Sequence, residues 1–302
     1  MKKKILILGG SSVIGFKLLK YCINNQFNVE YTYFRNQFSI NNKGFCLDIT
    51  NKETIQNIIS KIKPNIVIHA AALTNVDLCE TDHTLADRIN VDGTNNIIDA
   101  CKKINSKIVY ISSSYVFNGN RNEFFEYDKT FPSNYYGITK AKAEKLIQNS
   151  GLDHLILRTD QPYCWMESWQ RVNSVIRVIR AMKSHEIFRE ITDWYSNPTY
   201  VPNFVEATIR LIDSNLSGIY HIVGRDFISR YQWSLLVCDV FKLNKKLLVP
   251  ITSDFLKLPA KRYNIKLNCD KIFKDTHVKM IGVKNGLIQM LQDNKDYSTS
   301  LL

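Results

Sequence analysis

Short runs of apolar residues alternate with longer segments of helical periodicity through the first half of the 302-residue chain. The apolar runs predict strands at Lys4–Leu8, Val29–Tyr33, Ile66–Ala70, Ile108–Ser112, Leu155–Arg158 and Ile219–Val223. The periodic segments predict helices at Gly15–Asn25, Lys52–Lys63, Ala86–Ile104, Tyr135–Asn149, Arg171–Lys183 and Arg230–Phe241. Strands that are apolar throughout and alternate with helices are typical of a parallel sheet covered on both faces. The pattern therefore predicts an α/β protein with a doubly wound parallel sheet of Rossmann type.

The regular alternation ends near residue 160, and a polar, proline-containing tract occupies Pro250 to Cys269. We expect residues 1–160 to form a dinucleotide-binding domain, to which residues 190–224 return. Residues 161–189 and 225–302 are then expected to form a smaller, largely C-terminal substrate-binding region. No low-complexity linker separates the two regions, so we do not expect them to be independently folding domains.

A glycine-containing turn follows the first predicted strand and opens the first predicted helix. Glycine permits a tight turn and a close approach of the backbone to a pyrophosphate, and the helix N-terminus offers free N–H groups to that anion. The middle glycine of a GxxGxxG pattern is replaced by a serine here, whose hydroxyl could donate to a phosphate. The candidate cofactor-binding residues in this turn are Gly9, Ser11, Ser12, Val13, Ile14 and Gly15. A tight turn without a nucleotide is the structural alternative.

The end of the second strand normally distinguishes NAD from NADP, because an acidic residue there binds the ribose 2′-hydroxyl. This chain has no acid at that point, and Arg35 follows two residues after Tyr33. We therefore expect NADP(H) rather than NAD(H), with Arg35 at the 2′-phosphate. The alternative is an ordinary solvated arginine.

Tyr136 and Lys140 are four residues apart at the start of a predicted helix, so one turn places them on the same face. An ammonium beside a phenol favours the phenolate, so we expect a lowered Tyr136 pKa. Such a phenol can exchange a proton with a carbonyl or an alcohol. Three serines at the end of the preceding strand, Ser112 to Ser114, lie where open α/β sheets bind their ligands. A capped surface helix is the alternative interpretation.

Composition restricts the possible partners. Lys and Arg exceed Asp and Glu by 40 to 28, a net charge of +12 that favours anionic partners. No aromatic-interleaved basic stripe suggests nucleic-acid binding. The seven cysteines show no zinc-site spacing and no disulfide framework, and no apolar run is long enough to span a membrane. We expect a cytoplasmic protein with no metal, membrane or nucleic-acid partner.

The order of these motifs resembles the extended short-chain dehydrogenases/reductases that modify nucleotide sugars. Within that group the chain is similar to the dTDP-4-dehydrorhamnose reductases and to the related regulatory β subunit of methionine adenosyltransferase. The resemblance covers most of the chain and is carried by Gly9–Gly15, Leu47–Thr50, His69–Glu80, Asn90–Thr94, Ser113–Gly119, Tyr136–Lys140, Leu157–Thr159, Asn197–Thr199, Gly218–His221 and Lys261–Arg262.

The resemblance implies roles for individual residues. Tyr136 would protonate the ketone oxygen, Lys140 would be its charge partner and a ribose ligand, and Ser113 would hydrogen-bond the substrate oxygen. Further cofactor contacts would come from Asp48, Ile49, Ala70, Ala71 and Ala72. Further substrate contacts would come from Ser114, Thr74, Trp165, Asn173 and Arg262. The tryptophans could equally be packing anchors between the two regions.

The resemblance implies an NADPH-dependent reductase of a nucleotide-linked keto sugar, with a homodimer as the assembly. Ser114 stands where these reductases commonly have Asp, and the sugar dehydratases of the superfamily carry an acidic pair there, so dehydration is disfavoured. Two alternatives stay open. One is a non-catalytic NADP-binding regulatory subunit, and the other is a nucleotide-sugar epimerase that retains NAD.

Overall fold

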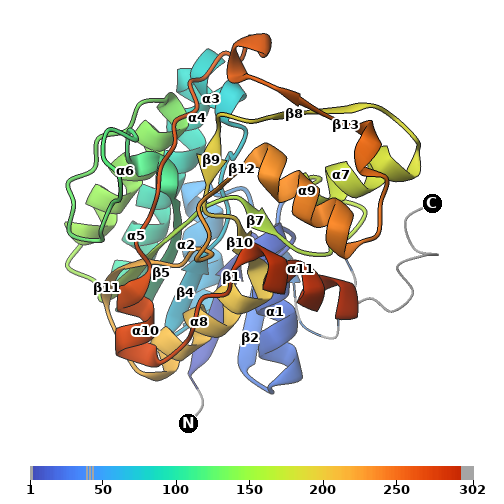
Figure 1. The fold of residues 1–302 in the computed structure, drawn as a ribbon. Helices are drawn as coiled ribbons and strands as arrows, with labels where there is room; N and C mark the ends of the chain where they lie inside the picture. The colour runs from blue at the N-terminus through green and yellow to red at the C-terminus, as the bar shows by residue number, and fades with distance from the viewer. Residues whose placement is uncertain (1–2, 39, 41, 43, 294–302) are drawn as a thin grey trace.

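Seven parallel strands form the central sheet of the computed structural model, which describes residues 3–38, 40, 42 and 44–293 (Figure 1). In spatial order they are β11 (Gly218–His221), β6 (His154–Thr159), β5 (Lys107–Ser113), β4 (Ile66–His69), β1 (Lys4–Leu8), β2 (Asn28–Tyr33) and β3 (Gly44–Cys46). The chain builds outward from β1 in one direction and from β4 in the other. The predicted doubly wound sheet is confirmed, and its order reverses between β1 and β4, where such sheets bind ligands.

Alternate residues of the strands face two helical layers. Ile5 and Ile7 of β1 pack in the cluster of α1 and α8, whereas Leu6 and Leu8 pack in the cluster of α2, α5 and α6. The first layer contains α1 (Val13–Asn24), α8 (Val201–Asp213) and the shorter α10 (Asp270–Thr276), and the second contains α2 (Lys52–Ile62), α5 (Gly93–Lys102) and α6 (Tyr135–Gln148). Both faces of the sheet are therefore covered by apolar helix surfaces.

Short paired strands and three helices build the remaining part, to the right of the sheet in Figure 1. The pairs are β8 (Phe188–Ile191) with β13 (Leu248–Ile251), β7 (Pro162–Tyr163) with β10 (Thr199–Tyr200), and β9 (Tyr195–Ser196) with β12 (Ile228–Ser229). The helices are α7 (Ser174–Lys183), α9 (Arg230–Val240) and α11 (Val283–Gln292), with single turns η3 (Lys245–Leu247) and η4 (Ser253–Phe255). Segments 161–189 and 225–293 thus meet through the β8–β13 pair. The predicted division into two regions stays a prediction.

Three short helical turns shape the carboxyl end of the sheet. They are α3 (Val76–Thr81), α4 (His83–Asp87) and the 3₁₀ turn η2 (Ser114–Val116). The long helix predicted from Ala86 to Ile104 is wrong as one regular helix, because a π-helical turn, η1 (Arg88–Asp92), separates α4 from α5. Single π-helical turns of this kind occur frequently at functional sites.

Candidate active site

The glycine turn after β1 has the geometry of a phosphate cradle. Gly9 has φ +81°, and a Cβ there would lie 2.8 Å from the backbone nitrogen of Ala71. Only glycine fits this contact without strain. Ser12 caps α1, its Oγ accepting from the N–H of Gly15 at 3.1 Å. The N–H groups of Val13 and Ile14 precede the first intrahelical bond, so the turn presents amides and a positive helix end to an anion.

The residues predicted at the adenosine end lie along the same edge of the sheet. Arg35 is exposed just past β2, with its guanidinium carbon 5.4 Å from the ring centre of Phe34. Asp48 follows β3 and accepts from both the N–H and the hydroxyl of Thr50 at 2.9 Å. Ile49 is buried beside it. No acidic residue stands at the end of β2 beside Arg35. This is consistent with the expectation that Arg35 binds a 2′-phosphate, which stays a prediction.

The loop after β4 carries Ala70 to Ala72, which are half-buried. Asn90, in the π-helical turn, accepts from the N–H of Leu73 at 2.8 Å and donates to its carbonyl at 3.1 Å. The same amide donates to Thr139 of α6 at 3.0 Å. Asn90 therefore fixes the β4 loop against the helix that carries Tyr136.

His69, at the end of β4, has a structural role in this fold. Its Nε2 lies 3.0 Å from the hydroxyl of Thr94, and burial lowers its pKa to about 3. A histidine held neutral in this way is a poor proton donor at neutral pH.

Ser113, Tyr136 and Lys140 converge at the carboxyl end of β5. Asn134 caps α6 by accepting from the N–H of Gly137 at 2.9 Å, which fixes where the helix begins. Tyr136 and Lys140 are 8% and 2% exposed, and Tyr136 is hydrogen-bonded with Ser113. The amine of Lys140 donates to the carbonyl of Ile111 at 2.6 Å. The three predicted catalytic residues are thus in one buried cluster, and their roles stay predictions.

The expected lowering of the Tyr136 pKa is wrong for this structure. Burial raises the pKa of Tyr136 above its usual value, and the hydrogen bond with Ser113 lowers it less. Burial also lowers the pKa of Lys140 to about 7. The amine lies against the Tyr110 ring, 4.0 Å from its centre, and on the carbonyl of Ile111. Burial outweighs the helix spacing here, and the result favours a protonated phenol.

Ser114 joins the site to a carboxyl group that sequence analysis did not single out. Its hydroxyl donates to Asp160 Oδ1 at 3.0 Å, and Asp160 Oδ2 accepts from the N–H of Asn197 at 2.9 Å. Ser114 is 1% exposed, so its substrate role stays a prediction that this burial does not favour. The sequence signal that could have indicated Asp160 is its place two residues after the predicted strand Leu155–Arg158, at the same sheet edge as Ser113.

A segment that we call the strap, residues 165–173, crosses the glycine turn. Gln170 donates to the carbonyls of Ser11 and Ser12 at 3.2 Å each, and the ring of Trp169 stacks on Phe38. At its far end, Arg171 reaches the carbonyl of Thr74 at 3.5 Å. The strap therefore spans the opening between the first helix and the β4 loop, over the predicted cofactor positions.

Two predicted substrate residues of the strap make internal contacts. The indole N–H of Trp165 donates to the carbonyl of Met290, and its ring meets Phe241 edge-on. Asn173 caps α7 through the N–H of Ile176 and donates to the carbonyl of Cys164. For Trp165 the structure shows the packing role left open as the alternative. Substrate contact by either residue stays a prediction.

Arg262 lies on the opposite side of the site, where it pairs with Asp77 at 2.9 Å and donates to the carbonyl of Ala260. Its guanidinium is 5.9 Å from the ring centre of Trp194, and that of Arg230 is 5.0 Å from the same ring. Arg230 in turn forms a buried ion pair with Glu190. Two arginines thus lie near one indole, each already paired with a carboxylate, and substrate contact by Arg262 stays a prediction.

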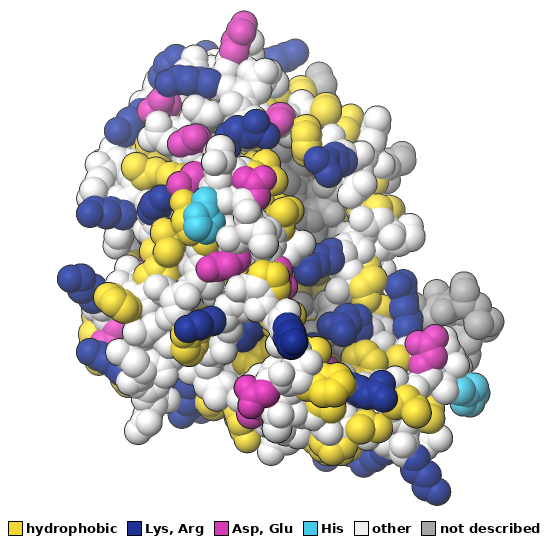
Figure 2. Space-filling model, turned by 90° about the horizontal axis from the view of Figure 1, so that it is seen from above, with side chains coloured by type: hydrophobic (Ala, Val, Ile, Leu, Met, Phe, Trp, Pro, Cys, Tyr) yellow, Lys and Arg dark blue, Asp and Glu magenta, His cyan; other side chains and the backbone are white. Residues whose placement is uncertain are grey.

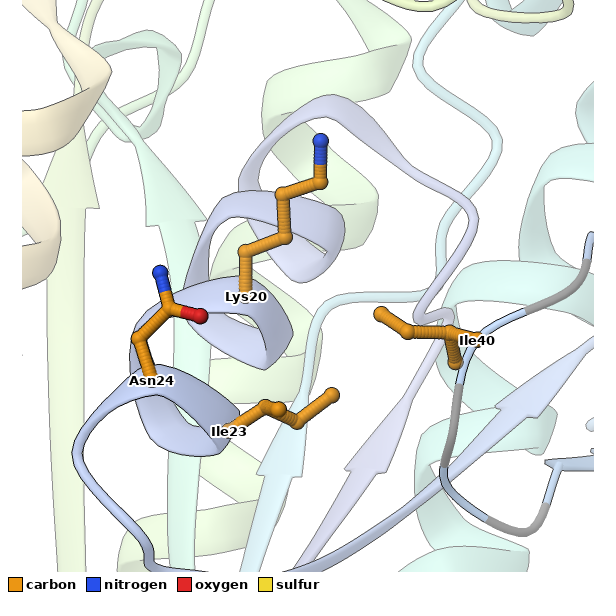
Figure 3. Close-up of a pocket in the computed structure, with 4 residues that line it drawn as sticks. All are labelled: Lys20, Ile23, Asn24 and Ile40. Atoms are coloured by element: carbon orange, nitrogen blue, oxygen red, sulfur yellow. The ribbon is translucent and has the colours of Figure 1, made fainter.

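Figure 2 shows the molecule from above, with a hollow near the middle of this face that hydrophobic, acidic and basic side chains border. A separate surface hollow of about 400 Å³ lies along α1 and is lined by Lys20, Ile23, Asn24 and Ile40 (Figure 3). Lys20 pairs with Glu167 of the strap at 3.1 Å. Among the described residues that line the hollow in Figure 3, Lys20 is the one titratable group, and its amine is paired with Glu167, so we place the active site at the sheet edge. Among the described residues, no helix is both long enough and apolar enough to cross a membrane.

The sequence model of the RmlD substrate binding domain family matches residues 2–295. The chain belongs to this family. It is 30% identical to the dTDP-4-dehydrorhamnose reductase of Aggregatibacter actinomycetemcomitans, over 89% of this chain and 92% of the relative. It is 25% identical to methionine adenosyltransferase 2 subunit beta of Bos taurus, over 97% of this chain and 90% of the relative.

A solved structure gives the same result for the fold. The dTDP-4-dehydrorhamnose reductase of Bacillus anthracis, in complex with NADP, aligns with a TM-score of 0.86 and 26% identity, over 97% of this chain and all of the other. The predicted resemblance to dTDP-4-dehydrorhamnose reductases is therefore confirmed. The family match and the structural alignment both include the sheet edge with Ser113 and Tyr136, and the roles of these residues stay predictions.

Proposed function

We propose that the protein is an NADPH-dependent reductase of a keto group on a nucleotide-linked sugar, similar to dTDP-4-dehydrorhamnose reductase. The observation that carries the proposal is the buried pair of Tyr136 and Ser113, at the same edge of the sheet as the glycine turn. The relatives named dTDP-4-dehydrorhamnose reductase and the related structure with NADP support the substrate and cofactor class.

The chain contains groups that fit the cofactor. Gly9 leaves the space that a Cβ would fill against Ala71, and the first turn of α1 offers amides to the pyrophosphate. When bound, NADPH supplies the hydride that the carbonyl carbon receives. Arg35 binds the 2′-phosphate, and the strap excludes water from the reacting groups.

Tyr136 delivers the proton. Ser113 donates a hydrogen bond to the substrate carbonyl oxygen and holds it near the phenol, and Tyr136 Oη then transfers its proton to that oxygen as the carbonyl becomes an alcohol. A phenol whose pKa is raised by burial is in the correct protonation state for this step. Lys140, one turn further along α6, has a pKa lowered to about 7 by burial, and a negative phenolate favours its protonated form, which in turn stabilises that phenolate.

Tyr136→Phe tests the proposal directly. The variant should lose roughly 100-fold or more in kcat for NADPH oxidation with a nucleotide-linked keto sugar, since general acid catalysis contributes about 10²–10⁴-fold. NADPH binding, followed by fluorescence titration, should change little. Tyr135→Phe is the matched control, because the phenol of Tyr135 donates to Asp87 at 2.8 Å instead. Full turnover in Tyr136→Phe would refute the role of the phenol.

Arg35→Ala tests the cofactor preference. The ratio of NADPH to NADH affinity should fall at least tenfold, because Arg35 has no charged partner to recognise in NADH. Arg210→Ala, an exposed arginine in the last turn of α8, is the control for loss of surface charge. An unchanged ratio in Arg35→Ala would remove this residue from the 2′-phosphate site.

A regulatory subunit is the second candidate, because the chain aligns over 97% of its length with methionine adenosyltransferase 2 subunit beta. In that case the protein would bind NADPH without oxidising it for any keto sugar in a panel of nucleotide-linked substrates. An epimerase would instead purify with NAD bound and oxidise no NADPH.

A further inference from the structure

A buried carboxyl group lies next to the proposed reductase site and is not used in the proposed mechanism. Asp160 directly follows β6, whose last residue, Thr159, is in register with Ser113 at the end of β5. Asp160 is 7% exposed. Burial of a carboxylate is costly unless its oxygens accept hydrogen bonds. Both oxygens of Asp160 accept a hydrogen bond. Oδ1 accepts from the Ser114 hydroxyl at 3.0 Å, and Oδ2 accepts from the backbone N–H of Asn197 at 2.9 Å.

Asp160 interacts electrostatically with titratable or charged groups on α6, η2 and α9. Its negative charge helps to raise the pKa of Tyr136 on α6 and of Tyr115 in η2. Arg230 on α9 acts in the opposite direction and lowers the pKa of Asp160. Asp160 is therefore coupled electrostatically to the phenol that donates the proton.

Two more groups act on the tyrosines from farther elements. Arg262 lowers the pKa of Tyr115, and Cys79 on α3 raises that of Tyr136. Arg262 and Cys79 are not carboxylates. Among the groups named here, Asp160 is therefore the carboxylate that raises the pKa of both Tyr115 and Tyr136.

We propose that Asp160 is a positioning residue for reduction. Its ionised carboxylate accepts the hydrogen bond that fixes the Ser114 hydroxyl, and with it the strand end that carries Ser113. The inference rests on the proposed reductase function. It also accounts for Ser114, which stands where related reductases commonly have Asp: here the carboxylate comes from the neighbouring strand, one hydrogen bond away.

Titration of this carboxyl group gives the proposal a pH signature. Burial raises the pKa of Asp160 to about 6, and the hydrogen bonds from Asn197, Ser114 and Gln161 lower it less. Below pH 6 the protonated carboxyl loses its charge and part of its acceptor capacity. Turnover should therefore fall on the acid side of pH 6, whereas NADPH binding should not follow the same curve.

Asp160→Asn is the first test. We expect kcat to fall at least tenfold at pH 7.5 and the acid limb near pH 6 to disappear, with the NADPH dissociation constant within twofold of wild type. Asp226→Asn is the matched control, since Asp226 also accepts from a backbone amide, that of Val283 at 2.7 Å. Wild-type turnover with an unchanged acid limb in Asp160→Asn overturns the proposal.

Two further variants keep the test valid if Asp160→Asn folds poorly. Ser114→Ala removes a hydrogen bond that lowers the Asp160 pKa, so the acid limb should move to higher pH; an unmoved limb contradicts the proposal. The double variant Ser114→Asp with Asp160→Ser transfers the carboxylate across the hydrogen bond. It should turn over at least tenfold faster than Asp160→Ser alone, and equal rates would show that the carboxylate is not required.

A spectroscopic measurement separates this inference from the reductase proposal. Carbon-13 NMR of protein with labelled aspartate carboxyls, with Asp160 assigned from its missing signal in Asp160→Asn, should show a pKa near 6 that rises in Ser114→Ala. If the wild-type protein shows this titration but reduces no keto sugar, the proposed function is refuted, and the positioning role is refuted with it. The hydrogen bond between Ser114 and Asp160 would still be supported. Turnover with an Asp160 pKa near 4 would refute the inference alone.

Discussion

At the scale of single residues, burial decides the protonation states that spacing cannot. Tyr136 and Lys140 are one turn apart, and spacing alone predicted an ammonium that lowers the phenol pKa. In the fold both side chains are almost completely buried, and burial penalises the charged form of each. The sequence therefore identified which residues meet, but not the direction in which their pKa values move.

The buried amine of Lys140 should make stability depend on pH. Its pKa falls from 10.5 to about 7 on folding, so between pH 7 and 10.5 the unfolded chain binds a proton that the folded chain has released. Above pH 10.5 the amine is neutral in both states and burying it costs no protonation free energy. As the pH falls from 10.5 to 7, folding must increasingly neutralise the amine, so the free energy of unfolding falls. Lys140→Met should therefore show a free energy of unfolding that rises less steeply with pH than that of wild type.

Urea unfolding at pH 7, 8 and 9 measures this slope. Lys142→Met is the control on the same helix, because Lys142 is exposed and pairs with Asp87 at 3.0 Å. It should keep the wild-type slope across this window. Equal slopes for Lys140→Met and wild type would show that the buried amine is not neutralised on folding.

At the scale of elements, α6 is fixed by a close approach to the turn that follows β5. A Cβ on Gly137 would lie 2.0 Å from the carbonyl oxygen of Tyr115. Gly137→Ala must therefore move α6 away from η2, and with it Tyr136 away from Ser113. We expect a loss of about 1–3 kcal/mol in stability from overpacking and a fall of at least tenfold in kcat.

Thermal unfolding and NADPH oxidation check this prediction. Gly93→Ala is the matched control within a helix, because its nearest contact is the flexible side-chain end of Ile49. That variant should lose less stability, since alanine favours a helix interior by about 1 kcal/mol over glycine. A Gly137→Ala variant with normal stability and turnover would mean that the η2 contact does not position α6.

Most elements with a clear apolar pattern were predicted from the sequence. Six of the seven sheet strands correspond to predicted apolar runs. The seventh, β3, was not predicted because its three residues are too few to show a strand pattern. Helices α8 and α11 were not predicted, although their apolar residues have the spacing of amphipathic helices. Asp160 was missed because its partner Asn197 directly follows β9, and no local sequence pattern shows that this segment lies beside the end of β6.

At the scale of the whole molecule, the dinucleotide-binding half depends on the later chain. Leu18 and Leu19 of α1 are in the same buried cluster as Phe204 and Val205 of α8, and β11 completes the sheet beside β6. The boundary predicted at residue 160 therefore does not mark the end of a hydrophobic core. Without residues 190–224, one face of α1 and one edge of the sheet would be exposed to water.

A fragment of residues 1–160 should consequently fail to fold, whereas residues 1–161 joined to 197–224 by a short glycine linker should fold and bind NADPH. The junction is feasible because the carbonyl of Gln161 accepts from the N–H of Thr199, and Asp160 accepts from that of Asn197. Circular dichroism should show cooperative thermal unfolding only for the joined chain. Cooperative unfolding of the 1–160 fragment would instead show that α8 and β11 are dispensable for this half.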